Sequence, residues 1–306
     1  MDTRLVKLDQ DHPGFRDQLY RQRRDYIANI ALSHRTDLPV PKAPYTEDEH
    51  SVWRAVRRLL TPLHRKWVCR ELNLVQDVLG LDEYRIPQFD TVNRRLMSHS
   101  GFRMTPVAGL VTPRTFLEQL AGRVFLSTQY IRHHSRPLYT PEPDVIHELI
   151  GHAASLIDKD IVDLSLAFGR AALRADEKAI NKLIRVFWYT LEFGAVEEEG
   201  QVKALGAGLL SSAGELAQFS HKAELRPWNV DVIAETPFDP TDYQPHIFIA
   251  PSFAKLVSDL GAWLNRMYPQ AYAPETPPPA LPLAGMWTQT VHRHQKRGAS
   301  NSTAPR

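Results

Sequence analysis

The stretch PEPDVIHELIGH, residues 141–152, carries two histidines and a glutamate at close spacing. In the zinc-protease pattern H-E-x-x-H the histidines are four residues apart on one face of a helix, and the glutamate acts as a base. His147 and His152 are five residues apart instead. Five residues of an ideal α-helix turn through about 500°, so these two side chains would diverge by roughly 140°. Gly151 would let the helix end or distort there, bringing the second imidazole round.

A buried metal ion is the favoured interpretation of this segment. Leu149 and Ile150 separate the histidines, which indicates that the segment packs into the interior. A buried His-Glu-His cluster needs a partner that offsets its loss of hydration. Two histidines and a carboxylate on one face of an ion leave the other face open to water, dioxygen and substrate, as in non-haem ferrous oxygenases. A purely structural pair of buried histidines is the alternative.

Glu192, within FWYTLEFG at 187–194, is the candidate third ligand. An acid in so apolar a segment is costly to bury unless it is neutralised or coordinated. Trp188 precedes it by four residues, so a helix would present both side chains on one face. A metal ligand and an aromatic wall would then be presented together. Spacing alone leaves this assignment open.

Composition narrows the class of protein. The 306 residues, 43% of them hydrophobic, suit one large domain or two small ones. Cys69 is the only cysteine, so an intramolecular disulfide, a cysteine-based zinc cluster and an iron–sulfur cluster are excluded, and histidines and carboxylates must hold any metal. The 37 basic and 35 acidic residues are spread evenly, so we expect no nucleic-acid partner. Without a long apolar run or the apolar core of a signal peptide, we expect no membrane association and a cytoplasmic location.

Local patterns predict helices in several segments. Residues 14–34 read as a helix with a basic, solvated outer face. A second helix begins at Thr46, which forms a capping box with Glu49, and Pro62 is expected to kink or split it. Its apolar residues recur with helical periodicity at Val52, Trp53, Val56, Leu59, Leu60 and Leu63. Residues 176–194 predict a deeply buried helix ending at Gly194, and 253–268 the last core helix.

Three long motifs resemble the catalytic domain of the pterin-dependent aromatic amino acid hydroxylases. They are RVFLSTQYIRHHSRPLYTPEPDVIHELIGH at 123–152, FWYTLEFG at 187–194 and GAGLLSSAGEL at 206–216. Shorter matches are DHPGF at 11–15, GFRMTPVAGL at 101–110 and YQP at 243–245. The resemblance implies a mainly α fold with a small β component. We expect a single catalytic domain over residues 1–272 and a proline-rich, basic, extended or disordered tail over 273–306.

The resemblance also implies an activity. Iron(II), held by His147, His152 and Glu192, would use dioxygen and a tetrahydropterin cosubstrate to hydroxylate the ring of an aromatic amino acid. Trp188 favours a phenylalanine-type pocket over the tryptophan-type one, and tyrosine stays open. A zinc hydrolase with Glu148 as base fails on the histidine spacing and leaves Arg132 unexplained. A non-catalytic pterin- or amino-acid-binding descendant is disfavoured because all three expected ligands are present.

Further roles follow from the matched motifs. Arg132 is expected to clamp the substrate carboxylate, with Asp144 holding the arginine in place; a plain buried salt bridge is the alternative. The other expected substrate-site residues are Thr140, Pro141, Trp188, Phe193, Gly208 and Ser211. Either Ser211 or Ser212 would also bond a ligand imidazole. Phe116 is expected to stack on the pterin, and the alternative for it is a core role; Val111, Glu148 and Phe187 complete the expected pterin site.

Some positions depart from the pattern of the animal enzymes. AASLIDKD follows His152 where a valine–proline start is expected, Phe187 replaces the usual tyrosine, and Ala195 replaces a larger apolar residue. The first two departures bear on the loop shape and the pterin contacts. The matched region begins near residue 11 and no heptad pattern follows the core, so we expect no regulatory domain and a monomer or dimer rather than a tetramer.

Overall fold

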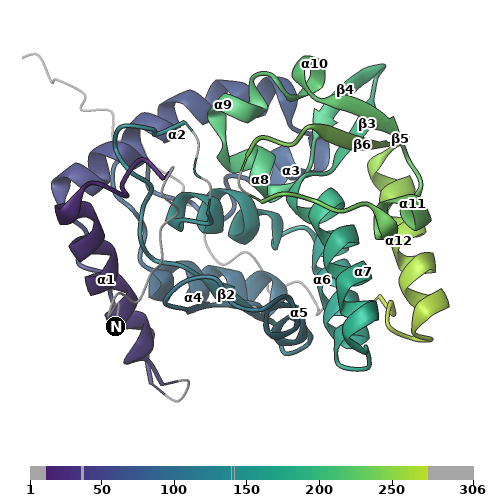
Figure 1. Ribbon diagram of the computed structural model, residues 1–306, viewed down its shortest axis with the longest axis horizontal. Coiled ribbons are helices and arrows are strands. Elements are labelled where there is room, and N and C mark those ends of the chain that lie inside the picture. Colours follow the sequence, from purple (N-terminus) through teal and green to yellow (C-terminus); the bar gives the residue numbers. More distant parts are fainter. Residues whose placement is uncertain (1–11, 36–37, 139, 141, 241, 275–306) are drawn as a thin grey trace, which may run out of the picture. The chain divides into compact units, whose positions relative to one another are not determined.

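The computed structural model describes residues 12–274, apart from positions 36–37, 139, 141 and 241 (Figure 1). Helices dominate these residues and strands are few, which confirms the predicted fold class. In this part of the chain, no helix is both long and apolar enough to cross a membrane. Most of the tail predicted from residue 273 lies outside the described residues, as does Pro141.

Four helices make up the N-terminal part of the fold. They are α1 (Gln18–Leu32), α2 (Glu47–Trp67), α3 (Arg70–Val75) and α4 (Phe89–Ser100). The side chain of Thr46 accepts a hydrogen bond from the backbone of Glu49, whose side chain bonds back to the Thr46 backbone, so the predicted capping box is confirmed.

Helix α2 continues through Pro62 to Trp67, so of the kink or split predicted at Pro62 the split is wrong. Proline removes one backbone hydrogen bond, but buried side chains hold the helix on both sides of it. Leu60 is fully buried before Pro62, and after it the His64 ring bonds the carbonyl oxygen of Leu210 at 2.6 Å. Leu59, predicted as part of the apolar face, is exposed.

The outer face of α1 is less solvated than its basic sequence predicts. Arg24 is buried and donates to the carboxylate of Glu142 through both terminal nitrogens, at 2.9 and 2.7 Å. Its guanidinium also lies over the Tyr130 ring, 3.7 Å from the centroid. An arginine–carboxylate fork of this kind fixes geometry as well as charge. Helix α1 is therefore anchored to the segment that leads into the two histidines.

Two small sheets accompany the helices. Strand β1 (Arg103–Pro106) pairs in parallel with β2 (Val124–Ser127). The second sheet has the order β4-β3-β6-β5, and its strands are β3 (Ala195–Glu198), β4 (Gln201–Ala204), β5 (Glu224–Pro227) and β6 (His246–Ala250). A two-residue turn of Glu199 and Gly200, both with positive φ, joins β3 to its antiparallel neighbour β4. Such a turn matches the twist of a hairpin.

The remaining helices form the core around the middle of the chain. The longer ones are α5 (Pro113–Ala121), α6 (Lys159–Ala172), α7 (Glu177–Phe187) and α12 (Phe253–Met267), and the shorter ones are α8 (Ala207–Ser211), α9 (Ala213–Leu216), α10 (Phe219–Lys222) and α11 (Val230–Glu235). Helices α6 and α7 lie side by side, α12 packs on α6, and α11 packs on α7 (Figure 1). The last core helix thus begins at Phe253, as predicted.

Two π-helical segments carry the candidate metal ligands. Segment η1 (His147–Ala153) contains both histidines, and η2 (Trp188–Glu192) continues directly from α7. A π-helix bonds residue i to i+5, so residues five apart lie closer to one face than in an α-helix. The predicted distortion is confirmed, but the helix does not end at Gly151. The helix predicted over 176–194 is α-helical as far as Phe187 and π-helical from Trp188, and it ends at Glu192.

Glycines let the ligand-bearing segments approach their neighbours. A Cβ atom on Gly151 would lie 2.6 Å from the Ala207 carbonyl oxygen, so η1 packs tightly against α8. A Cβ atom on Gly206 would overlap the backbone of Glu192, so the residue before α8 lies directly against the end of η2. Both glycines are therefore required by close backbone approach rather than by an unusual φ.

We predict that Gly151→Ala lowers the free energy of unfolding by about 1–3 kcal/mol. The added methyl group would meet the backbone of Ala207, which cannot rotate away as a flexible side chain could. Urea denaturation measures the loss, and the stoichiometry of divalent metal binding shows whether η1 still presents its histidines. Gly122→Ala is the matched control, since its Cβ would only reach an ordinary contact with the Gln119 oxygen at 3.6 Å. Equal stability of the two variants would contradict this account of η1.

Candidate metal centre and adjoining cavities

Three buried side chains converge on one point. The Nε2 atoms of His147 and His152 are 2.9 Å apart. Glu192 approaches them with Oε1 2.9 Å from His152 Nε2 and Oε2 3.5 Å from His147 Nε2. They form the one cluster of at least three His, Cys, Asp or Glu side chains among the described residues that could hold a metal ion, with ligand atoms within 4.8 Å of one another.

The donor set fits a divalent metal ion. Nitrogen and oxygen ligands of such ions lie at about 2.0–2.2 Å, so ligand atoms at right angles around one ion are about 3.0 Å apart. The separations of 2.9 and 3.5 Å in this cluster agree with that spacing. Two imidazoles and one carboxylate are also the ligand set of non-haem ferrous sites with open positions.

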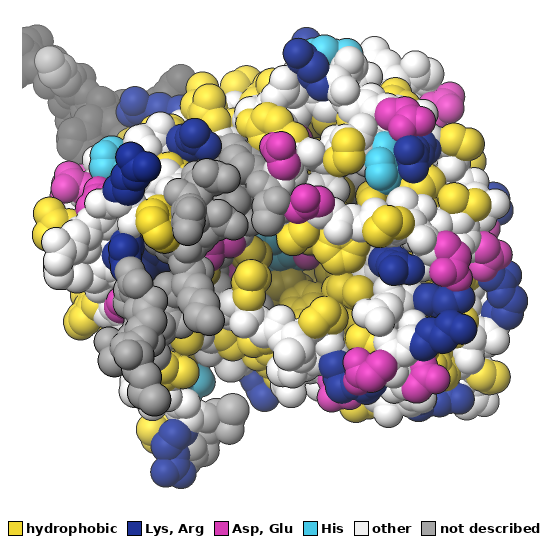
Figure 2. Space-filling view, in the orientation of Figure 1, with side chains coloured by type: hydrophobic (Ala, Val, Ile, Leu, Met, Phe, Trp, Pro, Cys, Tyr) yellow, Lys and Arg dark blue, Asp and Glu magenta, His cyan; other side chains and the backbone are white. Residues whose placement is uncertain are grey.

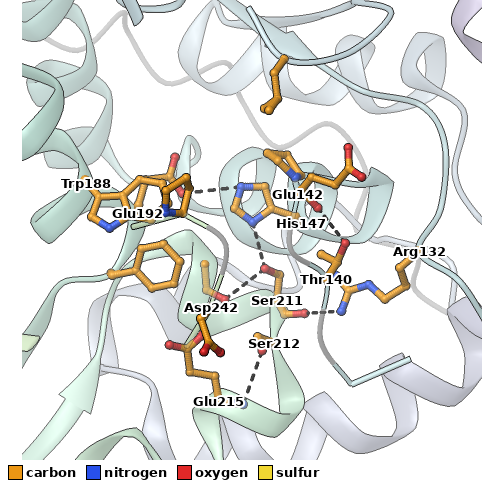
Figure 3. Close-up of a pocket in the computed structure, with 15 residues that line it drawn as sticks. Arg132, Thr140, Glu142, His147, Trp188, Glu192, Ser211, Ser212, Glu215 and Asp242 are labelled. Carbon is orange, nitrogen blue, oxygen red and sulfur yellow. Dashed lines mark hydrogen bonds and ion pairs between the residues drawn. The ribbon is translucent and has the colours of Figure 1, made fainter. Parts of the chain in front are cut away.

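Ser211, on α8, fixes the orientation of one imidazole. Its hydroxyl donates to the Ala207 carbonyl oxygen at 2.8 Å and lies 3.0 Å from His147 Nδ1 (Figure 3). Because that hydroxyl hydrogen is already used, its oxygen accepts from Nδ1–H, which leaves Nε2 without a proton and free to bind a metal. Ser212 bonds the Leu138 carbonyl oxygen instead. Of the two serines predicted for this contact, the structure places Ser211 at the ligand.

Burial and charge set the ionisation of the cluster. Burial, reinforced by the neighbouring His152, lowers the pKa of His147 to about 4, so this ring is neutral near pH 7. Burial opposes the charged forms of His152 and Glu192 as well, but their mutual attraction outweighs it. The pKa of His152 is therefore raised and that of Glu192 lowered. Charge on Glu192 is the state suited to a cation.

A cavity of about 200 Å³ opens on one side of the cluster and corresponds to the predicted substrate site. Figure 2 shows a hollow on this face with hydrophobic side chains around it. The predicted residues that line the cavity are Arg132, Thr140, Trp188, Phe193, Gly208 and Ser211, beside His147 and Glu192 (Figure 3). Asp144 lies behind Arg132 rather than on the cavity wall.

Arg132 is held firmly at this cavity. Its Nε and Nη2 atoms donate to the two carboxylate oxygens of Asp144 at 2.9 and 2.8 Å, and Nη1 donates to the Ser211 carbonyl oxygen at 3.1 Å. Asp144 also accepts from the backbone N–H of His147 at 3.0 Å. The remaining Nη1 bond, to the Pro137 carbonyl oxygen at 3.3 Å, is the longest of the four. A ligand carboxylate has this weaker partner to replace.

A second cavity of similar volume opens on the other side of the cluster. It gathers all the residues predicted for the pterin site, which are Val111, Phe116, Glu148 and Phe187. The Phe116 ring packs edge-on against Phe187, with centroids 5.3 Å apart. Glu148 Oε1 accepts from the backbone N–H of Thr128 at 3.0 Å, and burial raises the pKa of Glu148 to about 8.

The two cavities meet at the cluster, and the sequence did not reveal everything that lines them. Both are lined by Leu110, Pro143, His147, Trp188 and Glu192. The residues missed from the sequence include Glu142, Glu215, Phe238, Pro240 and Asp242. Glu215 had a usable signal, because it is an acid within the apolar segment GAGLLSSAGEL. Phe238, Pro240 and Asp242 lie in an irregular loop with no periodic pattern.

Comparison with known proteins agrees with this site. A family model described as biopterin-dependent aromatic amino acid hydroxylase matches residues 3–277. This chain belongs to that family. It is 43% identical over 275 residues to a phenylalanine-4-hydroxylase of Caenorhabditis elegans, with 87% of this chain and 60% of the relative covered. It is 39% identical to a tyrosine 3-monooxygenase of Schistosoma mansoni, with 94% and 61% covered. The chain thus spans about 60% of the length of these curated relatives.

Solved structures of the hydroxylase family share the fold. Phenylalanine hydroxylase from Chromobacterium violaceum, solved with bound iron(III) and the oxidised cofactor 7,8-dihydrobiopterin, superposes with a TM-score of 0.72 at 28% identity. The match covers 85% of this chain and 92% of that one. A second structure of the same protein, solved with bound oxidised iron(III), gives a TM-score of 0.71 at 30% identity, with 79% and 90% covered.

We predict that Ser211→Ala weakens iron binding about 10- to 100-fold, because the ring of His147 loses the acceptor that sets its tautomer. Titration of the metal-free chain with iron(II) under anaerobic conditions measures the change. Ser212→Ala is the matched control and is expected to leave iron affinity within about twofold, since Ser212 does not bond a ligand ring. Equal losses of iron affinity in both variants would show that Ser211 contributes no more to iron binding than Ser212 does.

The buried carboxyl of Glu215, a residue that is 4% exposed, makes the stability of the fold depend on pH. Burial raises the pKa of Glu215 from its ordinary value of 4.5 to about 7, so the folded chain holds this proton where the unfolded chain has lost it. The free energy of unfolding therefore falls as pH rises from about 4.5 to about 7, by up to about 3 kcal/mol from this group. Glu215→Gln removes that loss and keeps an oxygen acceptor.

The stability gain of Glu215→Gln is thus expected to be small below pH 4.5, to grow between pH 4.5 and 7, and to level off above pH 7. Urea denaturation of both proteins across this range measures it. A gain that is the same at pH 4.5 and pH 8 would contradict the raised pKa.

Proposed function

We propose that this chain is an iron(II)- and tetrahydropterin-dependent monooxygenase that hydroxylates the aromatic ring of phenylalanine. The observation that carries the proposal is the convergence of His147, His152 and Glu192 where two cavities meet. A reaction that joins an amino acid, a pterin and dioxygen needs two organic ligands beside one metal ion. Relatives named phenylalanine-4-hydroxylase and tyrosine 3-monooxygenase support this class over a zinc hydrolase.

The first cavity takes the amino acid in this proposal. Arg132 binds the carboxylate, and Asp144 holds the guanidinium so that its plane is set before the substrate arrives. Trp188 and Phe193 contact each other, with ring centroids 4.7 Å apart, and together form one apolar wall for the aromatic ring of the substrate. The ring is thereby directed toward the metal ligands while the charged end stays at the arginine.

The second cavity takes the tetrahydropterin. Phe116 stacks on its bicyclic ring, and Val111, Phe187 and Glu148 form the rest of the wall. When iron is bound by the three ligand side chains, it supplies the activation of dioxygen, which these side chains cannot perform themselves. Because both cavities share Trp188 and Pro143, the two organic ligands are held next to each other at the ion.

Phenylalanine is the proposed substrate because of the wall that faces its ring. Trp188 lines the first cavity with its large indole, which takes up room there. The indole also stacks on Phe238, with centroids 4.3 Å apart and an interplanar angle of 13°. Room taken by the wall disfavours tryptophan, the bulkiest of the three rings. Phe193 adds apolar surface to the same cavity, and this suits a ring without a hydroxyl group.

The test is an aerobic assay of the iron-loaded chain with a tetrahydropterin and, separately, phenylalanine, tyrosine and tryptophan. Products are identified by chromatography against standards for every ring position. We predict a hydroxylated product from phenylalanine that requires both iron and pterin. Glu192→Ala is expected to lower product formation by at least about 100-fold while leaving the fold intact. Undiminished hydroxylation by that variant, or product formed without pterin, would refute the proposal.

A further inference from the structure

Trp188 is one of the residues that line both cavities, so the position of its indole affects both. The indole lies between Phe193 and Phe238, with centroids 4.7 and 4.3 Å away. Stacking of this kind fixes the plane of a ring, but it restrains sliding within that plane only weakly. A directional contact at the edge of the indole is needed to hold it in place.

Gln244 supplies that contact. Its Oε1 atom accepts from the indole Nε1–H of Trp188 at 2.9 Å, and its side chain is buried, with 4% of the residue exposed. The amide nitrogen donates to the backbone carbonyl oxygens of Asp239 and Asp242, both at 3.2 Å. Carbonyl oxygens can only accept and the indole N–H can only donate, so these neighbours determine which end of the amide faces Trp188.

The backbone of Gln244 is anchored as well. Its backbone N–H donates to Glu215 Oε1 at 2.8 Å, and Glu215 is buried. At the other end of the same loop, the Tyr189 hydroxyl donates to the Pro237 carbonyl oxygen at 2.7 Å. The adjacent η2 residues Trp188 and Tyr189 therefore bond the two ends of one loop, Trp188 at Gln244 and Tyr189 at Pro237.

The loop between these anchors lines both cavities. Pro240 and Asp242 face the amino-acid cavity, and Phe238 faces the pterin cavity. The side chain of Gln244 bonds the backbone of this loop and the wall residue Trp188 at the same time. A substitution at Gln244 would therefore alter the linings of both cavities, although Gln244 bonds none of the three metal-ligand side chains through these contacts.

We propose that Gln244 is a positioning residue that sets how the site discriminates among aromatic amino acids, by fixing the Trp188 indole against the loop that carries Phe238, Pro240 and Asp242. This inference rests on the proposed function, because it concerns the amino-acid cavity of the same site. It assigns no chemical step to Gln244, which acts through Trp188 alone.

The hydrogen bond is tested first by NMR on the full chain, labelled with ¹⁵N and loaded with diamagnetic zinc in place of iron. The indole resonance of Trp188 is assigned as the one lost in Trp188→Phe. In Gln244→Leu we expect this resonance to shift and its proton to exchange with solvent at least about tenfold faster, since the donor has lost its acceptor. Gln244→Glu keeps an acceptor oxygen for the indole, and when its carboxyl is protonated the O–H can donate to one of the two loop carbonyl oxygens. Slow exchange is therefore expected to return in this variant at a pH below the pKa of the new carboxyl.

Other tryptophans serve as internal controls for folding. The indole N–H groups of Trp53, Trp228 and Trp263 bond Asp82, Asp259 and Asp231, away from this loop. Their resonances are expected to stay unchanged in Gln244→Leu. An unchanged Trp188 resonance would overturn the proposal, and so would a general loss of all four signals that Gln244→Glu fails to reverse.

Discrimination is then measured as binding, by calorimetric titration of phenylalanine and of tyrosine into the zinc-loaded chain. The dissociation constant for tyrosine divided by that for phenylalanine measures the discrimination. We expect Gln244→Leu to reduce this ratio about tenfold, and by less than about twofold when Trp188→Phe is already present. Equal effects in both backgrounds would overturn the proposal, as would an unaltered chain that binds neither amino acid. Because no turnover is involved, failure of the hydroxylation assay is a separate result that bears on the proposed function alone.

Discussion

The burial of three ionisable side chains around one point is the constraint on which the rest of this structure depends. His147, His152 and Glu192 are all largely buried, and such groups are strongly destabilising without an opposite charge or a metal ion. The widened turn of η1 brings the two imidazoles to 2.9 Å, and η2 delivers the carboxylate. Glycines at 151 and 206 allow α8 and its preceding turn to lie against both segments, so backbone packing and ligand geometry are set together.

The surroundings of the metal centre hold its parts in register from several directions. Asp144 fixes Arg132 and also bonds the first backbone N–H of η1, so Arg132 and His147 share one support. Helix α1 reaches the same segment through the Arg24–Glu142 pair. On the opposite wall, Gln244 and Glu215 hold the loop that faces Trp188. The two cavities therefore differ in their linings but depend on a common framework.

The sequence predicted this site better than it predicted the local structure that builds it. The three candidate ligands and most of the predicted substrate-site residues lie in long motifs that resemble one family, and the capping box at Thr46 follows from local chemistry. The π-helical turns were not predicted, because hydrophobic periodicity does not distinguish five-residue bonding from an α-helix that ends early. Continuity through Pro62 depends on His64 reaching Leu210, and the burial of Arg24 depends on Glu142. Both contacts join residues more than a hundred positions apart, which no local pattern encodes.

The central claim is that the widened turn of η1 and the end of η2 place all three side chains on one ferrous ion. X-ray absorption at the iron edge of the iron(II)-loaded chain, compared with Glu192→Ala, measures this directly. The account predicts one iron per chain, with scattering from two imidazole rings in both proteins and one fewer carboxylate oxygen in the variant. Scattering from a single imidazole in the unaltered chain, or identical spectra for the two proteins, would contradict it.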